Sequence, residues 1–152
     1  MANHKMTIRR IETGQNNPIL RSQSKAVKKI NAQIKRLALD MAETMEVKDG
    51  IGLAAPQVSK LLQIIVVKPA PRQEPLILVN PEIKKFSRKK DTMKEGCLSL
   101  PNIFVPVERS VKITVQGLDI DGQLVKIKAK GLLARVIQHE VDHLSGILIT
   151  DK

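Results

Sequence analysis

Two histidines four residues apart, with a glutamate directly after the first, stand near the end of the chain within Gln138–His143. In a helix, residues four apart stack one turn above the other, so the imidazoles of His139 and His143 can both bind one ion. At about 100° per residue, this pair falls on the apolar side of the helix and Glu140 lies beside it. The spacing predicts a metal-binding pair next to a buried carboxylate.

The carboxylate is the unusual member of this group. A carboxylate on an apolar face costs several kcal/mol unless something pairs with it. A lone histidine is most often a hydrogen-bonded core residue and a lone glutamate is most often solvated, but neither reading explains the whole cluster. Arg135, Gln138 and Asp142 fall on the opposite side of the same helix. The cluster is therefore interpreted as a catalytic metal site in which Glu140 moves a proton.

A third metal ligand has to come from elsewhere in the chain, because a tetrahedral catalytic site uses three protein ligands and one open position for water. Only nine residues follow His143; none is His or Cys, and Asp151 is their only acid. His4 lies close to the start of the chain. A single cysteine is most often an inert buried residue, but Cys97 is the strong donor that remains.

The composition fits one compact domain over residues 1–152, with 42% hydrophobic residues. Two Phe and no Trp or Tyr are present. We therefore expect a core of aliphatic side chains and methionine.

The net charge of +11 can attract nucleic acid, an anionic membrane or an RNA-rich assembly, or it can simply solubilise the surface. Without aromatic residues for stacking, no specific nucleic acid partner is expected. One cysteine cannot form an internal disulfide, and residues Met1–Arg10 lack the apolar run of a secretory signal. No stretch approaches the roughly 20 apolar residues of a membrane span. We expect a cytoplasmic protein, or an organellar one in a eukaryote, without a membrane partner.

Hydrophobic periodicity predicts two helices, one amphipathic from about Ser24 to Val47 and one from about Lys130 to Leu144, which Gly146 ends. Short β-branched runs predict strands between them, at Leu61–Val67, Leu76–Val79, Val111–Val115 and Leu124–Ile127. Asp121-Gly122 suits a tight hairpin between the last two. The basic segment Lys84–Lys94 is interpreted as a solvated loop or hairpin tip.

Three separate segments resemble the peptide deformylase family: Gly50-Ile51-Gly52-Leu53-Ala54-Ala55-Pro56-Gln57, Glu95–Ser99 and Gln138–His143. They stand in the family's order, and the resemblance extends from Ile8 to Ile149. It implies an α+β fold in which antiparallel strands surround a central helix that carries the HExxH motif. It also implies removal of the formyl group from the N-terminal formylmethionine of new polypeptides, with release of formate.

The resemblance implies one divalent metal ion, held by Cys97, His139 and His143. Ligand softness alone suggests Zn, whereas the family implies Fe(II) in the cell, with Zn, Ni or Co able to replace it. Such an ion would supply hydroxide near neutral pH to attack the formyl carbon, with Glu140 as general base and then general acid. The resemblance assigns the developing oxyanion to two donors, the backbone N–H of Leu98 and the side-chain amide of Gln57.

The expected substrate site surrounds the metal. Gly50 and Gly52 permit close backbone approach, so that a peptide can lie along this segment, although they could also simply end the preceding helix. The expected substrate-binding residues are Gly50, Ile51, Gly52, Gly96, Leu132 and Val136; for Leu132 and Val136 the alternative is plain core packing. The resemblance also implies that Glu95 pairs with Arg109 and holds the Cys97 loop.

Two other functions remain open from the sequence: a small metallopeptidase, and an inactive relative that serves as a basic binding module. Many relatives continue into a further C-terminal helix, linked in some to ribosome docking, whereas this chain stops at Lys152. Docking through that element is therefore in doubt, and the basic surface is expected to give at most a weak ribosome association. The expected partner is an N-formylmethionyl nascent peptide, and the expected state is a monomer.

Overall fold

The structure, a computed structural model, describes residues 7–152. Residues 1–6, with His4 and most of the segment judged not to be a secretory signal, lie outside the described residues. The α+β class with antiparallel sheets is confirmed. The elements follow one another as α1 (Ala32–Val47), β1 (Gly52–Ala54), η1 (Ala55–Val58), β2 (Ile64–Val67), β3 (Leu76–Phe86), β4 (Lys90–Cys97), β5 (Leu100–Ser110), β6 (Lys112–Leu118), β7 (Leu124–Lys130), α2 (Gly131–Leu144) and η2 (Ile149–Asp151).

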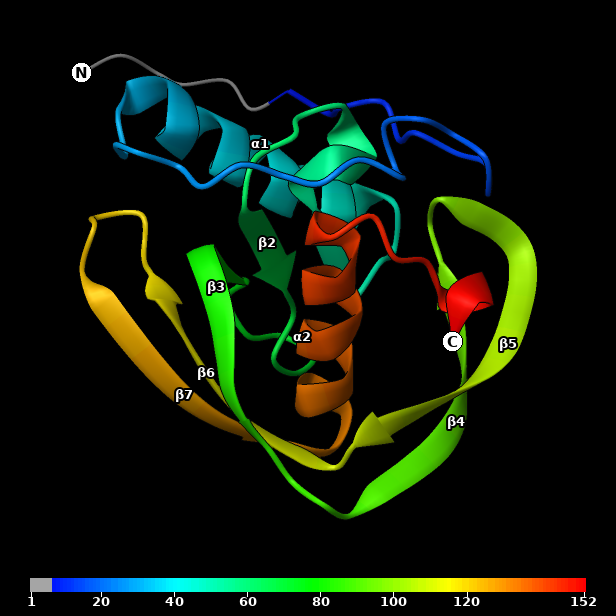
Figure 1. Ribbon diagram of the computed structural model, residues 1–152. Coiled ribbons are helices and arrows are strands. Elements are labelled where there is room, and N and C mark those ends of the chain that lie inside the picture. The colour runs from blue at the N-terminus through cyan, green and yellow to red at the C-terminus, as the bar shows by residue number, and fades with distance from the viewer. Residues whose placement is uncertain (1–6) are drawn as a thin grey trace.

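The strands form two antiparallel sheets around α2. A five-stranded sheet has the order β1-β2-β3-β6-β7, and β4 pairs with β5 in a separate two-stranded sheet. In Figure 1, α2 runs through the middle of the molecule, with β6 and β7 on one side, the β4–β5 ribbon on the other and α1 across one end. α2 contacts strands of both sheets. The HExxH motif on α2 therefore lies between the two sheets.

The helix α1 begins later than the predicted start at Ser24. Asn31 caps it, since its side-chain oxygen accepts a hydrogen bond from the N–H of Ile34 at 3.0 Å. The preceding backbone bonds elsewhere: the N–H of Ser24 donates to the carbonyl of Leu144, and Asn80 exchanges two hydrogen bonds with the backbone of Val27. These long-range partners replace the helical ones, so the predicted first two turns do not form.

The segment Lys84–Lys94 is not the predicted loop or hairpin tip. β3 continues through Phe86, β4 starts at Lys90, and only residues 87–89 turn between them. β3 pairs with β6 and β4 with β5, so this turn joins the two sheets. The basic side chains of Lys84–Lys94 are exposed, while the strand backbone on both sides of the turn is paired. The apolar pattern therefore does not reveal these strands. Strands β1 and β5 were also not predicted.

The core is aliphatic, as predicted. α1 packs Leu37, Met41 and Met45 against β2, and α2 packs its apolar residues against the five-stranded sheet. Both phenylalanines lie outside the core, since Phe86 is 59% and Phe104 67% exposed. No helix in residues 7–152 is both long and apolar enough to span a membrane.

Candidate active site

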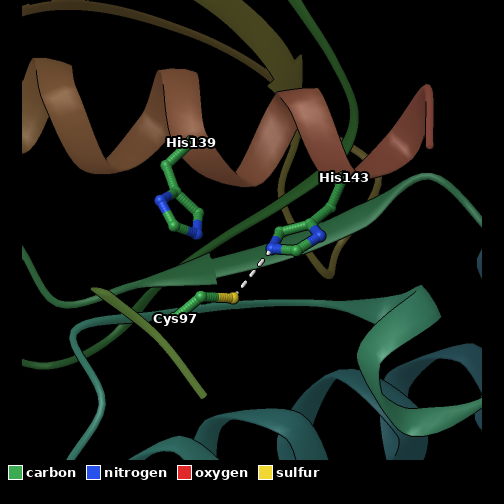
Figure 2. Close-up of side chains that lie close together, drawn as sticks. All are labelled: Cys97, His139 and His143. Carbon is green, nitrogen blue, oxygen red and sulfur yellow. Dashed lines mark hydrogen bonds between the residues drawn. The ribbon is translucent and has the colours of Figure 1, made fainter. Parts of the chain in front are cut away.

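Three ligand atoms of the kind that bind transition metals converge between the sheets. The donor atoms of Cys97, His139 and His143 all lie within 4.8 Å of one another. Cys97 Sγ is 3.4 Å from His143 Nε2. Figure 2 shows both imidazoles extending from α2 towards the Cys97 sulfur. The three residues singled out in the sequence are therefore close enough to bind one ion.

The chain brings Cys97 to α2 through a tight turn. Cys97 ends β4 and pairs with Leu100 at the start of β5, so Leu98 and Ser99 form the two-residue connection. The N–H of Gly14 donates to the carbonyl of Ser99 at 3.0 Å, which ties the turn to the N-terminal segment. The sulfur thus lies on a fixed connection rather than on a free loop.

Glu95 orients the first histidine. Its Oε1 lies 2.9 Å from His139 Nδ1 and also accepts from Arg109, and its Oε2 accepts from Arg109 and Arg135 at 2.6 Å each. Burial alone would raise the pKa of Glu95, but the bonds from His139, Arg109 and Arg135 outweigh it and lower that pKa to about 2. A proton on His139 Nδ1 leaves Nε2 free to bind a metal, which is the usual arrangement of a ligating histidine.

The predicted pair of Glu95 and Arg109 is present, but the sequence did not indicate the second arginine. Arg135 was placed on the helix side away from the metal, and it is 5% exposed. Its guanidinium reaches Glu95, the carbonyl of Val107 and the side chain of Asp91, and so links α2 to β4 and β5. The β4–β5 ribbon covers Arg135, which bonds the partner of His139 and lines the same cavity, so this side of α2 is not solvent-exposed as the sequence suggested.

The charges around the histidines suit a cation. Burial alone would lower the pKa of His139, but the charge of Glu140 and the hydrogen bonds with Cys97 and Glu95 outweigh it and raise that pKa to about 10. Burial, with His139 and Arg109 nearby, lowers the pKa of His143, which keeps a neutral ring that can act as a ligand. Groups that favour a proton on His139 also favour a divalent ion at the same place. The donor set therefore fits a transition metal such as zinc or iron.

Glu140 is buried beside this group, as predicted, and is 4% exposed. Its Oε1 has no hydrogen-bond partner within residues 7–152. Burial raises the pKa of Glu140 to about 7, although the charges of His139 and Arg109 lower it. A buried carboxylate with a free oxygen, lining the same cavity as His139, is placed to exchange a proton with a bound molecule.

Gln57 is buried next to the thiol, not on the surface as its loop position alone would suggest. Its Oε1 accepts from the N–H of Ala54 at 2.9 Å, so its Nε2 faces the site. That Nε2 donates to Ser99 Oγ at 3.0 Å and lies 3.6 Å from Cys97 Sγ. The amide is therefore a preorganised donor at the metal site.

A cavity of about 650 Å³ opens onto these groups. Of the residues predicted from the sequence, Gly50, Ile51, Gly52, Gln57, Gly96, Cys97, Leu98, Leu132, Val136, His139 and Glu140 all line it. His143 is not among the lining residues and is 1% exposed, so it lies behind the others. The cavity is also lined by Phe104, which the sequence did not single out.

Gly52 has to be glycine where it faces Glu140. A Cβ there would lie 2.5 Å from Glu140 Oε2 and 2.8 Å from Val136 Cγ1. The missing side chain lets the backbone of β1 approach the carboxylate, whereas the sequence predicted close approach of a peptide to this backbone. At Gly96 a Cβ would lie 2.6 Å from Phe104 Cε1, so the ring lies over that backbone.

The buried pair of Glu95 and Arg109 is expected to couple energetically. In a double-mutant cycle with Glu95→Gln and Arg109→Gln, we expect about 1–3 kcal/mol of coupling in the free energy of unfolding, measured by urea denaturation of the metal-free protein. The E95Q variant and the double variant both lose the contact of Glu95 with Arg135. This contact therefore does not contribute to the coupling energy. Additive effects of the two substitutions would show that the pair does not hold the Cys97 connection.

Comparison with known proteins agrees with this arrangement. A family model described as polypeptide deformylase matches residues 8–152. A peptide deformylase of Dictyoglomus thermophilum is 51% identical over 135 residues, which are 89% of this chain and 86% of the relative. This chain belongs to the polypeptide deformylase family.

Solved structures of the family have the same fold. A peptide deformylase from Thermotoga maritima superposes with a TM-score of 0.91 at 40% identity, covering 98% of both chains. A class I type b peptide deformylase from Acinetobacter baumannii, solved with Met-Ala-Ser bound, gives 0.90 at 34% identity over 97% of this chain and 99% of that one. As a polypeptide deformylase the chain is a hydrolase of a metalloenzyme family that deformylates N-formylmethionyl peptides.

Proposed function

We propose that this enzyme removes the formyl group from the N-terminal formylmethionine of newly made polypeptides and releases formate. One observation carries the proposal: the ligand atoms of Cys97, His139 and His143 meet beside a buried carboxylate with a free oxygen. The cavity next to them is large enough for a peptide end. We further propose that residues 1–152 act as one catalytic domain, since strands of both sheets pack on α2, and that the enzyme works as a monomer.

Cys97 as a thiolate, His139 through Nε2 and His143 through Nε2 would hold the metal. A divalent ion bound there would supply an activated water and polarise the formyl carbonyl. We propose iron(II) as the ion in the cell. The donor set of one sulfur and two nitrogens also accepts zinc, nickel or cobalt.

The peptide would bind along the edge of β1. β1 is the outermost strand of its sheet, and the N–H of Lys68 bonds to the carbonyl of Ile51. Bonded and non-bonded pairs alternate in an antiparallel ladder, so Gly52, opposite Val67, directs its N–H and C=O away from β2. An extended peptide can add to these free groups as a further strand. The Met-Ala-Ser bound to the Acinetobacter relative is a peptide of the required kind.

The methionine side chain would enter the apolar part of the cavity. Ile51 and Leu132 are 49% and 59% exposed there, and Val136 lies buried between Leu132 and the metal ligands. Contact with a thioether side chain would cover the two exposed residues, and burying such a side chain yields about 1.5–3 kcal/mol. Gly50 and Gly96 would lie beside the peptide backbone, and their missing side chains let Leu98 and Phe104 pack against the cavity wall.

Glu140 would transfer the proton in this reaction. Its carboxylate would take a proton from the attacking water and give it to the amine nitrogen as the carbon–nitrogen bond breaks. The products are formate and a free N-terminal amine. The oxygen that becomes negative would accept hydrogen bonds from the N–H of Leu98 and from Gln57 Nε2.

The donor role of Gln57 gives a test in the rate. Gln57→Ala is expected to lower kcat by about 10²–10³-fold with little change in metal content, because one preorganised oxyanion donor is lost. Steady-state deformylation assays on metal-loaded protein measure this. Ser99→Ala, which removes only the hydroxyl bonded to Gln57, is the milder control; a Q57A enzyme as active as the control would remove Gln57 from the reaction.

The activity itself is tested by formate release from formyl-Met-Ala-Ser by metal-loaded protein, with acetyl-Met-Ala-Ser as the matched control. We expect formate and free Met-Ala-Ser from the first peptide and no reaction with the second. Internal cleavage of a longer peptide would identify a metallopeptidase instead. No reaction with any peptide, at full metal occupancy, would identify a binding protein.

A further inference from the structure

The outer surface of the five-stranded sheet carries a row of lysines that the catalytic site does not use. In the β6–β7 ladder, Lys112 pairs with Lys130, Thr114 with Lys128 and Gln116 with Lys126. Directly paired residues point to the same side of a sheet, and alternate residues along a strand share a side. Lys126, Lys128 and Lys130 therefore project from β7 on one face, with Lys112 beside them.

Strand β3 extends this face by one more lysine. Lys85 pairs with Thr114, which in turn pairs with Lys128, so the three side chains form a row across the sheet. We call Lys85, Lys112, Lys126, Lys128 and Lys130 the lysine face; all five are exposed. Arg88 and Lys89, both exposed, occupy the turn at its end.

The part of the chain that the structure describes does not neutralise the lysine face. No ion pair within residues 7–152 uses any of its five lysines. Glu82, opposite Gln116, is bonded to Lys84 at 3.0 Å. Like charges directly opposite each other, as in Lys112 and Lys130, destabilise a sheet. The face therefore favours an external polyanion.

The face lies on the far side of the sheet from the active site. Ile113, Val115 and Ala129, which alternate with the lysines along β6 and β7, pack in the same core cluster as Ala134 and Ile137 of α2. A partner bound to the lysines would therefore not cover the cavity at Glu140. An enzyme could be held by this face and still take a peptide.

The side chains of the face favour one class of polyanion. Membrane surfaces bind through apolar side chains as well as cations, and the one large exposed apolar residue here is Leu124, at the end of β7. Single-stranded nucleic acid binds through stacked aromatics, but Phe86 pairs with Ile113 on the opposite side, and Phe104 lines the cavity. Lysines without aromatics suit the phosphate backbone of structured RNA.

We propose that the lysine face binds the backbone of structured RNA without base specificity. The binding itself does not depend on the proposed function. Its biological role does, since an enzyme that acts on nascent peptides works beside an RNA-rich particle. The role of the face is to raise the local concentration of the enzyme at its substrate. Its contribution to binding is electrostatic and falls steeply with salt.

Binding is tested with a fluorescent RNA duplex of about 20 base pairs, at several salt concentrations. Lys126→Gln, Lys128→Gln and Lys130→Gln are combined in one variant. The control variant combines Lys28→Gln, Lys29→Gln and Lys35→Gln, which removes the same charge from exposed positions in and before α1. We expect the face variant to bind at least about tenfold more weakly at 100 mM salt, and its log–log salt slope to be smaller by about 2–3 than that of the wild type. The control variant should bind within about twofold of wild type.

Equal weakening of both variants would overturn the proposal, because net charge alone would then explain binding. So would wild-type protein that does not bind the duplex, or that binds vesicles of anionic lipid more tightly than RNA. Deformylation of a short free formyl peptide by the same proteins separates the two claims. The face variant should keep this activity, and an inactive wild type that still bound RNA would contradict only the catalytic proposal.

Discussion

Replacing Glu140 with glutamine is expected to lower kcat for deformylation by about 10²–10⁴-fold while the metal stays bound. Glutamine has the same shape, so it fits the narrow space between α2 and Gly52, where Glu140 Oε2 approaches the backbone. It cannot accept and release a proton at neutral pH. The ligand atoms of Cys97 and the two histidines are untouched.

Two measurements separate this loss from a structural effect. Elemental analysis of E140Q should give the metal content of the wild type, and KM should change less than kcat. Glu108→Gln, at an exposed position of β5, makes the same chemical change away from the cavity and should leave the rate unaltered. Activity of E140Q close to the wild type would mean that another group moves the proton.

Replacing Cys97 with serine is expected to abolish stable metal binding and, with it, deformylation. A serine hydroxyl stays protonated at neutral pH and is a much weaker ligand than a thiolate. Loss of partners that merely orient a ligand costs about 10–100-fold in metal affinity. Loss of a ligand atom itself should exceed about 100-fold, as measured by competition with a chelator of known affinity.

A carboxylate offers a graded control for this change. Cys97→Asp restores an anionic donor that zinc accepts, so it should retain more metal than C97S. Urea unfolding of metal-free C97S should stay near that of the metal-free wild type, because the contacts of the thiol with Gln57 Nε2 at 3.6 Å and His143 Nε2 at 3.4 Å are long. Full metal occupancy in C97S after chelator treatment would exclude the sulfur as a ligand.

The sequence was sufficient to single out four side chains that the structure brings close together. His139 and His143 follow from helical spacing, Cys97 from the need for a third ligand, and the burial of Glu140 from its place on the helix. These inferences use short-range periodicity and the small number of strong donors in the chain. The structure places all four together.

The groups that surround the ligands were harder to predict, because they depend on contacts far apart in the sequence. Arg135 was assigned to the side of α2 away from the metal, but it is buried against the β4–β5 ribbon, bonds Glu95 and lines the same cavity as His139. The ribbon itself was not predicted because exposed strands have no apolar alternation to reveal them. Gln57 lacks a local signal, and only the resemblance to a family drew attention to it.

The same limit applies to the first helix. Apolar residues recur at helical spacing from Val27 onward, yet the helix starts at Ala32. The backbone of Val27 is instead hydrogen-bonded to the side chain of Asn80, which lies in β3. A partner 53 residues away along the chain overrides the local pattern. Periodicity gives the face of such a helix more reliably than its first residue.

The most direct test of the site is X-ray absorption spectroscopy at the metal edge of the zinc-loaded enzyme. We predict one sulfur neighbour at about 2.3 Å and two imidazole nitrogens at about 2.0–2.1 Å, with a further light atom from water. Loading C97S to the same occupancy under excess zinc should remove the sulfur signal and keep the imidazoles. A spectrum of wild-type protein with no sulfur neighbour, or with fewer than two imidazoles, would contradict the assignment of the metal to Cys97, His139 and His143.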